Sequence, residues 1–369
     1  MIVIKIFIFL MNIIYFFIKL IPCKDKIVMI SRQSNNVNND FRLLGEALKE
    51  YEVVYLCKTL DDGADSSFAS KIKYGFHMFR QMYHLASSKV CILDSYCPAV
   101  SILKHKKELT IIQIWHSVGS MKSFGYNILS KEEGSDDRLA RAMKMHNNYS
   151  FACGSSKDTI KTLALGFNLP LEKMKIFTLP RIDLLKDDTY ETKIKADIYA
   201  DYPQLKDKKN IVYAPTFRKD ESSLNDKLND LVRYIDFERY NFIVKLHPLS
   251  KVQIENNNVI NDKKYSTFDM IFIADKFISD YSCVIYEAGI KGVSLYFYNY
   301  DMENYNDIRG FDLDYRTVPG YTEPDPQKLA EDLDKEYDFD KLNSFIKHYV
   351  ENTDNCTDKL ANEIRKYMK

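Results

Sequence analysis

The chain has 369 residues, and its 52 acidic and 52 basic side chains leave no net charge at pH 7. At the usual ~100–200 residues per domain, this length predicts two or three domains. The balanced charge argues against nucleic-acid binding, which usually needs a clearly basic domain. Seven cysteines are scattered without a paired CxxC or metal-ligand spacing, which favours reduced thiols in a cytosolic setting.

The N-terminal segment is unusually apolar. Residues 2–21 are long enough to span a bilayer as a helix. Four polar residues interrupt the run: Lys5, Asn12, Tyr15 and Lys19. They fall within roughly 80° of arc on a helical wheel, and a single polar stripe favours a helix that lies in the membrane interface over a spanning one. Three basic residues follow that would contact anionic headgroups: Lys24, Lys26 and Arg32. A spanning helix and a buried core helix remain the alternatives.

Short apolar runs then alternate with segments of helical spacing. The expected strands are Lys26–Ser31, Glu52–Cys57, Lys89–Leu93, Thr110–Trp115, Tyr149–Ala152, Met174–Leu179, Asn210–Tyr213, Asn241–Leu246, Lys276–Ile278 and Val293–Tyr298. The expected helices are Phe41–Glu50, Phe76–Ser87, Asp136–Met145, Lys157–Leu165 (capped by Ser156 and ended by Gly166), part of 186–208, Val284–Lys291 and most of the chain from Pro326 onward, with a turn-rich loop at 61–67. This rhythm predicts parallel sheets with helices on both faces.

We expect three parts in the chain. Residues 1–22 form a membrane-associated helix, and residues 23–178 form an N-terminal Rossmann-like domain. Residues 179–369 form a C-terminal Rossmann-like domain, with a last helix that could pack on the first domain. The expected fold class is α/β, with two doubly wound domains facing a cleft.

Polar and basic residues follow the C-terminal ends of several expected strands. They are His116, Arg181, Thr216, Arg218, His247, Ser279, Asp280 and Ser282. Ligands of open α/β sheets bind beyond these ends, so the pattern predicts a shared ligand crevice. An arginine fork suits phosphate oxygens, a helix start attracts anions, and histidines can accept a proton near neutral pH. Each residue also has a purely structural alternative, such as a surface arginine, a helix cap or a strand terminator.

With these residues located, the chain resembles the CDP-glycerol:poly(glycerophosphate) glycerophosphotransferase family of teichoic acid and capsule synthesis. Six short stretches carry the resemblance in the right order: QIWHSVGSMKSFGY, LPRID, YAPTFR, VKLHP, ISDYSCVIYEAG and YNYDMENYNDIRGF. The chain departs from the family pattern at four positions: Ser117, Leu179, Cys283 and Glu287.

The resemblance implies a GT-B fold and peripheral attachment to the cytoplasmic face of the plasma membrane. It also implies transfer of glycerol phosphate or ribitol phosphate from a CDP-polyol to a lipid-linked or polymer acceptor, with release of CMP and without a metal cofactor. A GT-B glycosyltransferase that uses a nucleotide sugar is the main alternative, and a catalytically silent membrane scaffold is another. The oligomeric state is not predicted.

The resemblance further implies that the N-terminal domain binds the acceptor and that the C-terminal domain binds the CDP-polyol donor. It also implies roles for individual residues. His116 and His247 would be catalytic, with His116 as the base that takes the acceptor proton. The donor would be bound by Arg181, Thr216, Arg218, Ser279, Asp280, Ser282 and Glu287. Gly119 and Lys122 would form an acceptor or phosphate loop, and Asp301 and Arg309 would lie near the donor. Two DxD strings, which start at Asp312 and Asp332, are interpreted as solvated charge, so no metal site is expected.

Overall fold

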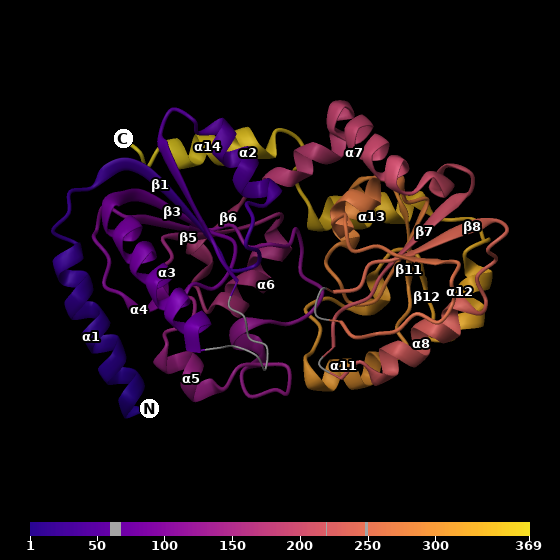
Figure 1. The fold of residues 1–369 in the computed structure, drawn as a ribbon, viewed down its shortest axis with the longest axis horizontal. Helices are drawn as coiled ribbons and strands as arrows, with labels where there is room; N and C mark the ends of the chain where they lie inside the picture. Colours follow the sequence, from indigo (N-terminus) through magenta and orange to yellow (C-terminus); the bar gives the residue numbers. More distant parts are fainter. Residues whose placement is uncertain (60–67, 219, 248–249) are drawn as a thin grey trace. The chain divides into compact units, whose positions relative to one another are not determined.

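The computed structural model describes residues 1–59, 68–218, 220–247 and 250–369, without the side chains of 68–73 (Figure 1). The loop expected at 61–67 lies outside the described residues. The chain forms two compact units. Unit 1 comprises Met1–His116, Phe124–Arg181 and Asn352–Lys369, and unit 2 comprises Ser117–Ser123 and Ile182–Glu351. The main break, at Arg181, lies close to the expected boundary after residue 178, but each unit also takes one segment from the other half of the sequence.

Unit 1 is built on a parallel sheet with strand order β2-β1-β3-β4-β5-β6. The strands are β1 (Lys24–Ser31), β2 (Glu52–Cys57), β3 (Ser88–Leu93), β4 (Thr110–Gln113), β5 (Phe151–Gly154) and β6 (Met174–Ile176). The helices are α1 (Ile2–Ile18), α2 (Asn39–Ala47), α3 (Phe68–Ser87), α4 (Pro98–Ile102), α5 (Asp137–Ala142), α6 (Lys157–Phe167) and α14 (Cys356–Arg365). The strand order reverses between β1 and β3, which is where ligands bind in such sheets.

Unit 2 has a second parallel sheet, with order β12-β11-β10-β7-β8-β9. The strands are β7 (Lys209–Ala214), β8 (Tyr240–Val244), β9 (Val259–Asn261), β10 (Lys276–Ser279), β11 (Ser294–Phe297) and β12 (Tyr321–Thr322). The helices are α7 (Asp188–Asp201), α8 (Ser222–Val232), α9 (Thr267–Met270), α10 (Ile285–Ile290), α11 (Met302–Ile308), α12 (Pro326–Asp332) and α13 (Phe339–Tyr349). This is the doubly wound order in which the switch point lies between the first and fourth strands, here β7 and β10.

The central strands are buried on both faces, as parallel sheets require. The last six residues of β1 and all four of β11 are buried. Large rings fill the core of unit 2, where Tyr213, Phe242 and Tyr298 belong to one cluster of buried side chains. These apolar runs are the reason that the main strands could be located from the sequence.

Several expected boundaries were wrong for local reasons. The strand expected to reach Trp115 ends at Gln113, because Trp115 has a left-handed backbone with φ of 64°. Gly166 lies inside α6, and Asn168 ends the helix with φ of 52°. Ser156 caps α6 as expected, by accepting a hydrogen bond from the Thr159 backbone at 3.1 Å. Strands β9 and β12 were missed because they have only three and two residues.

Helix α1 lies along unit 1, and three of its four polar residues, Asn12, Tyr15 and Lys19, face the unit, whereas Lys5 is exposed. The Lys104 backbone N–H donates to Asn12 Oδ1 at 2.8 Å, and Lys19 Nζ donates to the Lys104 carbonyl at 2.7 Å. Tyr15 is fully buried, and its hydroxyl lies 3.0 Å from His105 Nδ1. The outward face is apolar instead. Its exposed large side chains are Ile2, Val3, Ile6, Phe7, Phe9, Leu10, Ile13, Ile14, Phe16 and Phe17.

Two of the basic residues expected to contact headgroups form hydrogen bonds within the protein. Lys26 is buried and donates to Ser87 Oγ at 2.5 Å. Arg32 Nη1 donates to the Tyr96 carbonyl at 3.2 Å. That expectation was therefore wrong for Lys26, which is buried, and it stays a prediction for Arg32, which is partly exposed. Among the residues described, none of the helices has the length and apolar character needed to cross a bilayer. All seven cysteines are free thiols.

Candidate functional site

His116 follows β4 at the carboxyl end of the unit 1 sheet, and the structure holds its ring firmly. Trp115, just before it, adopts a left-handed backbone with φ of 64°, a conformation that costs about 1–3 kcal/mol for a residue other than glycine. The Trp115 ring packs against Phe124 and Phe167, with centroids 4.7 and 5.1 Å away. The same ring lies 4.1 Å from the imidazole of His116. This packing compensates for the backbone strain and fixes where the histidine points.

The hydrogen bonding of His116 leaves one ring nitrogen suited to accept a proton. Nδ1 lies 2.9 Å from the carbonyl oxygen of Asp94, and a carbonyl can only accept, so Nδ1 carries the hydrogen. Nε2 therefore has the lone pair. The residue as a whole is exposed. The hydrogen bond to Asp94 favours one tautomer of the ring.

Two aspartates lie near this histidine, Asp40 in the first turn of α2 and Asp94 just after β3. Asp40 accepts from the Arg181 backbone at 2.8 Å and from Arg181 Nη1 at 2.6 Å. Arg181 Nη2 in turn donates to the His116 carbonyl at 3.0 Å. Asp94 is buried, which raises the pKa of its carboxyl to about 6. Arg181 was expected with the donor-binding residues, but the structure places it in unit 1 beside His116.

In unit 2, one carboxylate links the ends of β7 and β10 at the switch point. Asp280, which follows β10, is fully buried and accepts from the Thr216 backbone N–H at 2.9 and 3.0 Å. It also accepts from Arg218 Nη1 at 3.0 Å. Ser279 Oγ donates to the Ala214 carbonyl at 2.9 Å. The two strand ends are thus joined by side chains that sequence analysis had assigned directly to the donor.

Arg218 is held from a second side by Asp301. Nε and Nη2 donate to the two oxygens of Asp301 at 2.7 and 2.9 Å, a bidentate pair, and only 8% of the Arg218 side chain is exposed. The ring centroids of Tyr281 and Tyr300 lie 5.7 and 5.2 Å from the guanidinium carbon. Burial alone would lower the pKa of Arg218, but Asp280 and Asp301 raise it.. The surface-arginine alternative is wrong, and the side chain is committed to a structural network.

Thr216 offers a different kind of group at the same place. It is only 6% exposed, and its Oγ1 is buried without a hydrogen-bond partner in the part of the chain that the structure describes. A buried hydroxyl without a partner is costly. Thr216 Oγ1 is therefore a polar atom at the switch point whose hydrogen-bonding capacity the described part of the protein leaves unused.

Gly119 and Lys122 lie in the short segment that belongs to unit 2. A Cβ on Gly119 would come within 2.3 Å of the Tyr286 ring, so this position requires glycine for close packing. The Lys122 side chain is half-buried, and its ammonium has no hydrogen-bond partner within the described ranges. Burial, followed by the charge of Arg309, lowers the pKa of Lys122 to about 8. Cys283, Asp280 and Arg218 complete its charged surroundings.

His247 follows β8 on the other side of β7. Its ring lies 4.8 Å from that of Phe217, between centroids. Its pKa is lowered, first by partial burial and then by the positive charge of Lys122. Beside it is a cavity of about 370 Å³ at the ends of β8 and β9. The cavity is lined by His247, Ser250, Asn261, Lys263, Ser266 and Thr267 among others.

The remaining expected residues have less distinctive surroundings. Ser282 is partly exposed just before α10, and Glu287 is buried within that helix. Arg309 Nε donates to the Ser123 carbonyl at 3.1 Å. Among the described residues there is no group of three or more His, Cys, Asp or Glu side chains placed to hold a metal ion.

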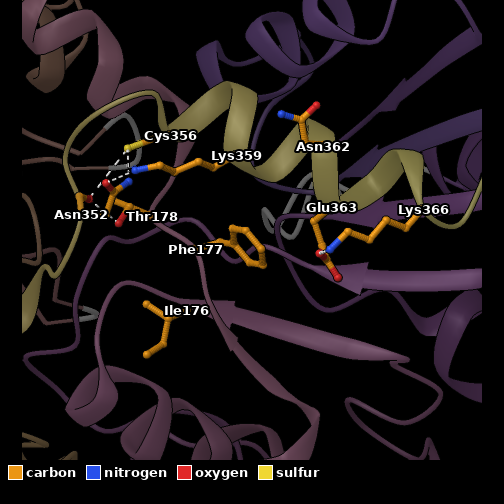
Figure 2. Close-up of a pocket in the computed structure, with 9 residues that line it drawn as sticks. All are labelled: Ile176, Phe177, Thr178, Asn352, Cys356, Lys359, Asn362, Glu363 and Lys366. Atoms are coloured by element: carbon orange, nitrogen blue, oxygen red, sulfur yellow. Dashed lines mark hydrogen bonds and ion pairs between the residues drawn. The ribbon is translucent and has the colours of Figure 1, made fainter.

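A separate cavity of about 370 Å³ lies in unit 1, where β6 ends beside α14 (Figure 2). Figure 2 shows Asn352, Cys356 and Lys359 grouped at one end of it, with Glu363 and Lys366 at the other. Thr178 Oγ1 donates to the Asn352 carbonyl at 2.6 Å. No residue expected from the sequence to carry function lines this cavity, so it is not part of the candidate site.

Sequence analysis missed three aspartates that organise the site. Asp40 holds Arg181 through its carboxylate, and Asp94 holds the His116 ring through its backbone carbonyl. Asp312, interpreted as solvated charge, instead accepts from Ser120 and Ser123, and burial raises its pKa. That interpretation was wrong for Asp312, and also for Asp332, which is buried on α12. The position of Asp94 at a strand end was a usable signal, whereas nothing local marked Asp312.

The structure thus has two doubly wound parallel sheets with polar and basic residues at the carboxyl ends of their strands, the edge at which α/β enzymes bind their ligands. The model of the family CDP-Glycerol:Poly(glycerophosphate) glycerophosphotransferase matches residues 13–366. The chain therefore belongs to this family and is an enzyme of the phosphotransferase class, which confirms the resemblance.

Relatives support the same assignment along most of the chain. It is 28% identical to the teichoic acid ribitol-phosphate primase of Bacillus spizizenii, covering 93% of this chain and 92% of the relative. It is 29% identical to the teichoic acid glycerol-phosphate primase of Bacillus subtilis, covering 79% of this chain and 77% of the relative. It spans only about half of a poly(ribitol-phosphate) polymerase, 55% of that relative's length.

The solved structure of the wall teichoic acid polymerase TagF has a similar fold. It superposes with a TM-score of 0.74 at 20% identity, covering 99% of this chain and 97% of the TagF chain. This similarity confirms an α/β fold with two parallel-sheet domains of the GT-B type.

Proposed function

We propose that the protein transfers glycerol phosphate or ribitol phosphate from a CDP-polyol to a hydroxyl of a lipid-linked or polymer acceptor in teichoic acid or capsule synthesis, releasing CMP. The observation that carries the proposal is the group at the β7–β10 switch point of unit 2. A buried Thr216 hydroxyl without a partner and the Lys122 ammonium stand there beside a rigid Asp280–Arg218 network. Hydroxyls and cations at such a crevice bind phosphate.

The cavity beside His247 fits the nucleoside part of this donor. Its volume of about 370 Å³ is at the lower end of the range for small-molecule sites. Asn261 and Lys263 are exposed on its wall, and such side chains can bond to base and ribose oxygens. We infer that CDP lies with its cytidine in this cavity and its phosphates towards Thr216. A TagF variant soaked with CDPG was solved with a similar fold, at a TM-score of 0.72 and 18% identity.

His116 supplies the base in this reaction. The acceptor oxygen attacks the β-phosphorus, the bond from that phosphorus to the bridging oxygen breaks, and CMP leaves with the electron pair. Nε2 of His116 takes the proton from the acceptor hydroxyl. Transfer of this kind depends mainly on positioning and charge stabilisation. We propose that the Trp115 packing and the Asp94 carbonyl give His116 that position.

We also propose that α1 binds the cytoplasmic face of the plasma membrane as an interfacial helix. The support is the outward apolar face, where Phe9 and Phe17 are 65% and 63% exposed. Lys104 and Lys107 are exposed in the loop that holds α1 by hydrogen bonds, and each basic residue near anionic lipid adds about 1 kcal/mol. A lipid-linked acceptor would make this attachment useful, because it brings the enzyme to its substrate.

The test is CMP release by the purified protein with bacterial membranes. CDP-glycerol, CDP-ribitol and a panel of nucleotide sugars are offered in parallel, with and without EDTA. Release from one CDP-polyol supports the proposal and identifies the donor. Release only from a nucleotide sugar would assign the protein to the glycosyltransferases instead. The EDTA arm decides whether a metal is needed.

A further inference from the structure

The segment Ser117–Ser123 follows His116 in the chain but packs entirely within unit 2. Asp312 fixes it by its two carboxylate oxygens. Ser120 Oγ donates to Oδ2 at 2.6 Å, and Ser123 Oγ donates to Oδ1 at 2.6 Å. Hydrogen bonds to a carboxylate are stronger than neutral ones. We call this arrangement of Ser120, Ser123 and Asp312 the aspartate clamp.

Backbone contacts complete the attachment. Lys122 forms an isolated antiparallel bridge with Phe311. The Asp312 N–H donates to the Met121 carbonyl at 3.1 Å, and the Ser123 N–H donates to the Gly310 carbonyl at 3.0 Å. Residues on both sides of Lys122 are thus held in place, so the position of its Cα is set by unit 2.

The Lys122 side chain lies among charged and titratable groups near the β7–β10 switch point of unit 2. Its charged and titratable neighbours come from four elements: Arg218 after β7, Asp280 and Cys283 after β10, Arg309 after α11, and His247 after β8. Asp280 already accepts from Arg218 and from two backbone N–H groups. No carboxylate among the described residues forms an ion pair with Lys122, so its charge is available to a ligand.

Resting on the proposed function, we propose that Lys122 binds the phosphates of the CDP-polyol within unit 2 and donates to the oxygen of the leaving CMP, and that the aspartate clamp positions it. As the β-phosphorus–oxygen bond breaks, that oxygen gains the electron pair and a negative charge. A fixed cation there stabilises the transition state more than the ground state. This assigns Lys122 to the donor, where the sequence had placed it in an acceptor or phosphate loop. Asp312 touches no substrate and is a positioning residue.

Donor binding without acceptor separates the two roles of Lys122. Titration with CDP-glycerol and CDP-ribitol is compared for the wild type, Lys122→Met, Lys122→Arg and the control Lys341→Ala, an exposed lysine on α13. We expect Lys122→Met to weaken donor binding at least ~10-fold and to lower kcat by ~10²–10³-fold, as for other single charge-stabilising groups. Lys122→Arg should recover most of both, and Lys341→Ala should equal the wild type. Lys122→Met with normal donor binding and a raised acceptor KM would overturn the assignment.

The clamp is tested by Asp312→Asn, with Asp314→Asn as the matched control, because Asp314 is exposed two residues away. We expect Asp312→Asn to lower kcat about 10-fold at an unchanged acceptor KM, and Asp314→Asn to be neutral. Combining Asp312→Asn with Lys122→Met should add almost nothing to the loss from Lys122→Met alone. Fully additive losses would refute positioning through Lys122. If the wild type released no CMP from either CDP-polyol, the proposed function itself would fail, which is a different result.

Discussion

Replacing Arg218 by methionine tests whether this side chain is a structural anchor. The substitution keeps much of the volume but leaves Asp280 and Asp301 without their cation, and these carboxylates are only 0% and 15% exposed. Breaking a buried ion pair from one side costs about 3–5 kcal/mol. At about 2–4 °C per kcal/mol for a body of this size, unit 2 should unfold roughly 6–20 °C lower.

The assay is differential scanning calorimetry of the full chain. The control is Arg316→Met, because Arg316 is 88% exposed and pairs with Asp314 at the surface, where such pairs contribute about 1 kcal/mol or less. Adding Asp301→Asn to Arg218→Met should recover part of the loss, because one uncompensated carboxylate disappears. If Arg218→Met unfolded at the same temperature as Arg316→Met, the anchor reasoning would be refuted, and a direct role in donor binding would be the better account.

Three further predictions concern the other parts of the molecule. His116→Ala should lower turnover by about 10²–10⁴-fold with unchanged CDP-polyol binding; unchanged turnover would mean that another group is the base. Because the pKa of Lys122 is about 8, its positive charge is lost as the pH rises through that value, so kcat/KM for the donor should fall there; Lys122→Arg should abolish the fall. Phe9→Ser with Phe17→Ser should weaken vesicle binding by ~10²-fold or more, at ~1.5 kcal/mol or more per buried ring, whereas Leu165→Ser, on the equally exposed Leu165 of α6, should not.

The fold was predictable because its strands are continuous apolar runs followed by polar residues. The same pattern located His116, Thr216 and His247 at strand ends. Contacts between residues far apart in sequence were not predictable: nothing in the local pattern of Asp312 shows that it accepts from Ser120 and Ser123. Similarly, the polar stripe of α1 was recognised, but its inward direction depends on Lys104 and His105, which lie some ninety residues later.

Because the polar stripe contacts unit 1, the case for membrane binding now depends on the exposed apolar face of α1. Asn12 and Tyr15 attach α1 to unit 1, so the helix is a fixed part of that unit. The spacing of polar residues in the sequence could show that the helix has a polar and an apolar face. Only the contacts made by each face show which one packs on the protein and which one is exposed.

The exchanged segments limit how such enzymes can be recombined. A single crossover at residue 181 between two relatives would join residues 117–123 of one parent to residues 309–312 of the other, and α14 of one parent to β6 and α2 of the other. A chimera joined at residue 181 would therefore have two sets of contacts in which the packed residues come from different parents. Exchanging residues 117–123 and 352–369 together with the unit that each packs in should give chimeras that fold. The segments that can be exchanged between relatives therefore follow the structural units and not the two halves of the sequence.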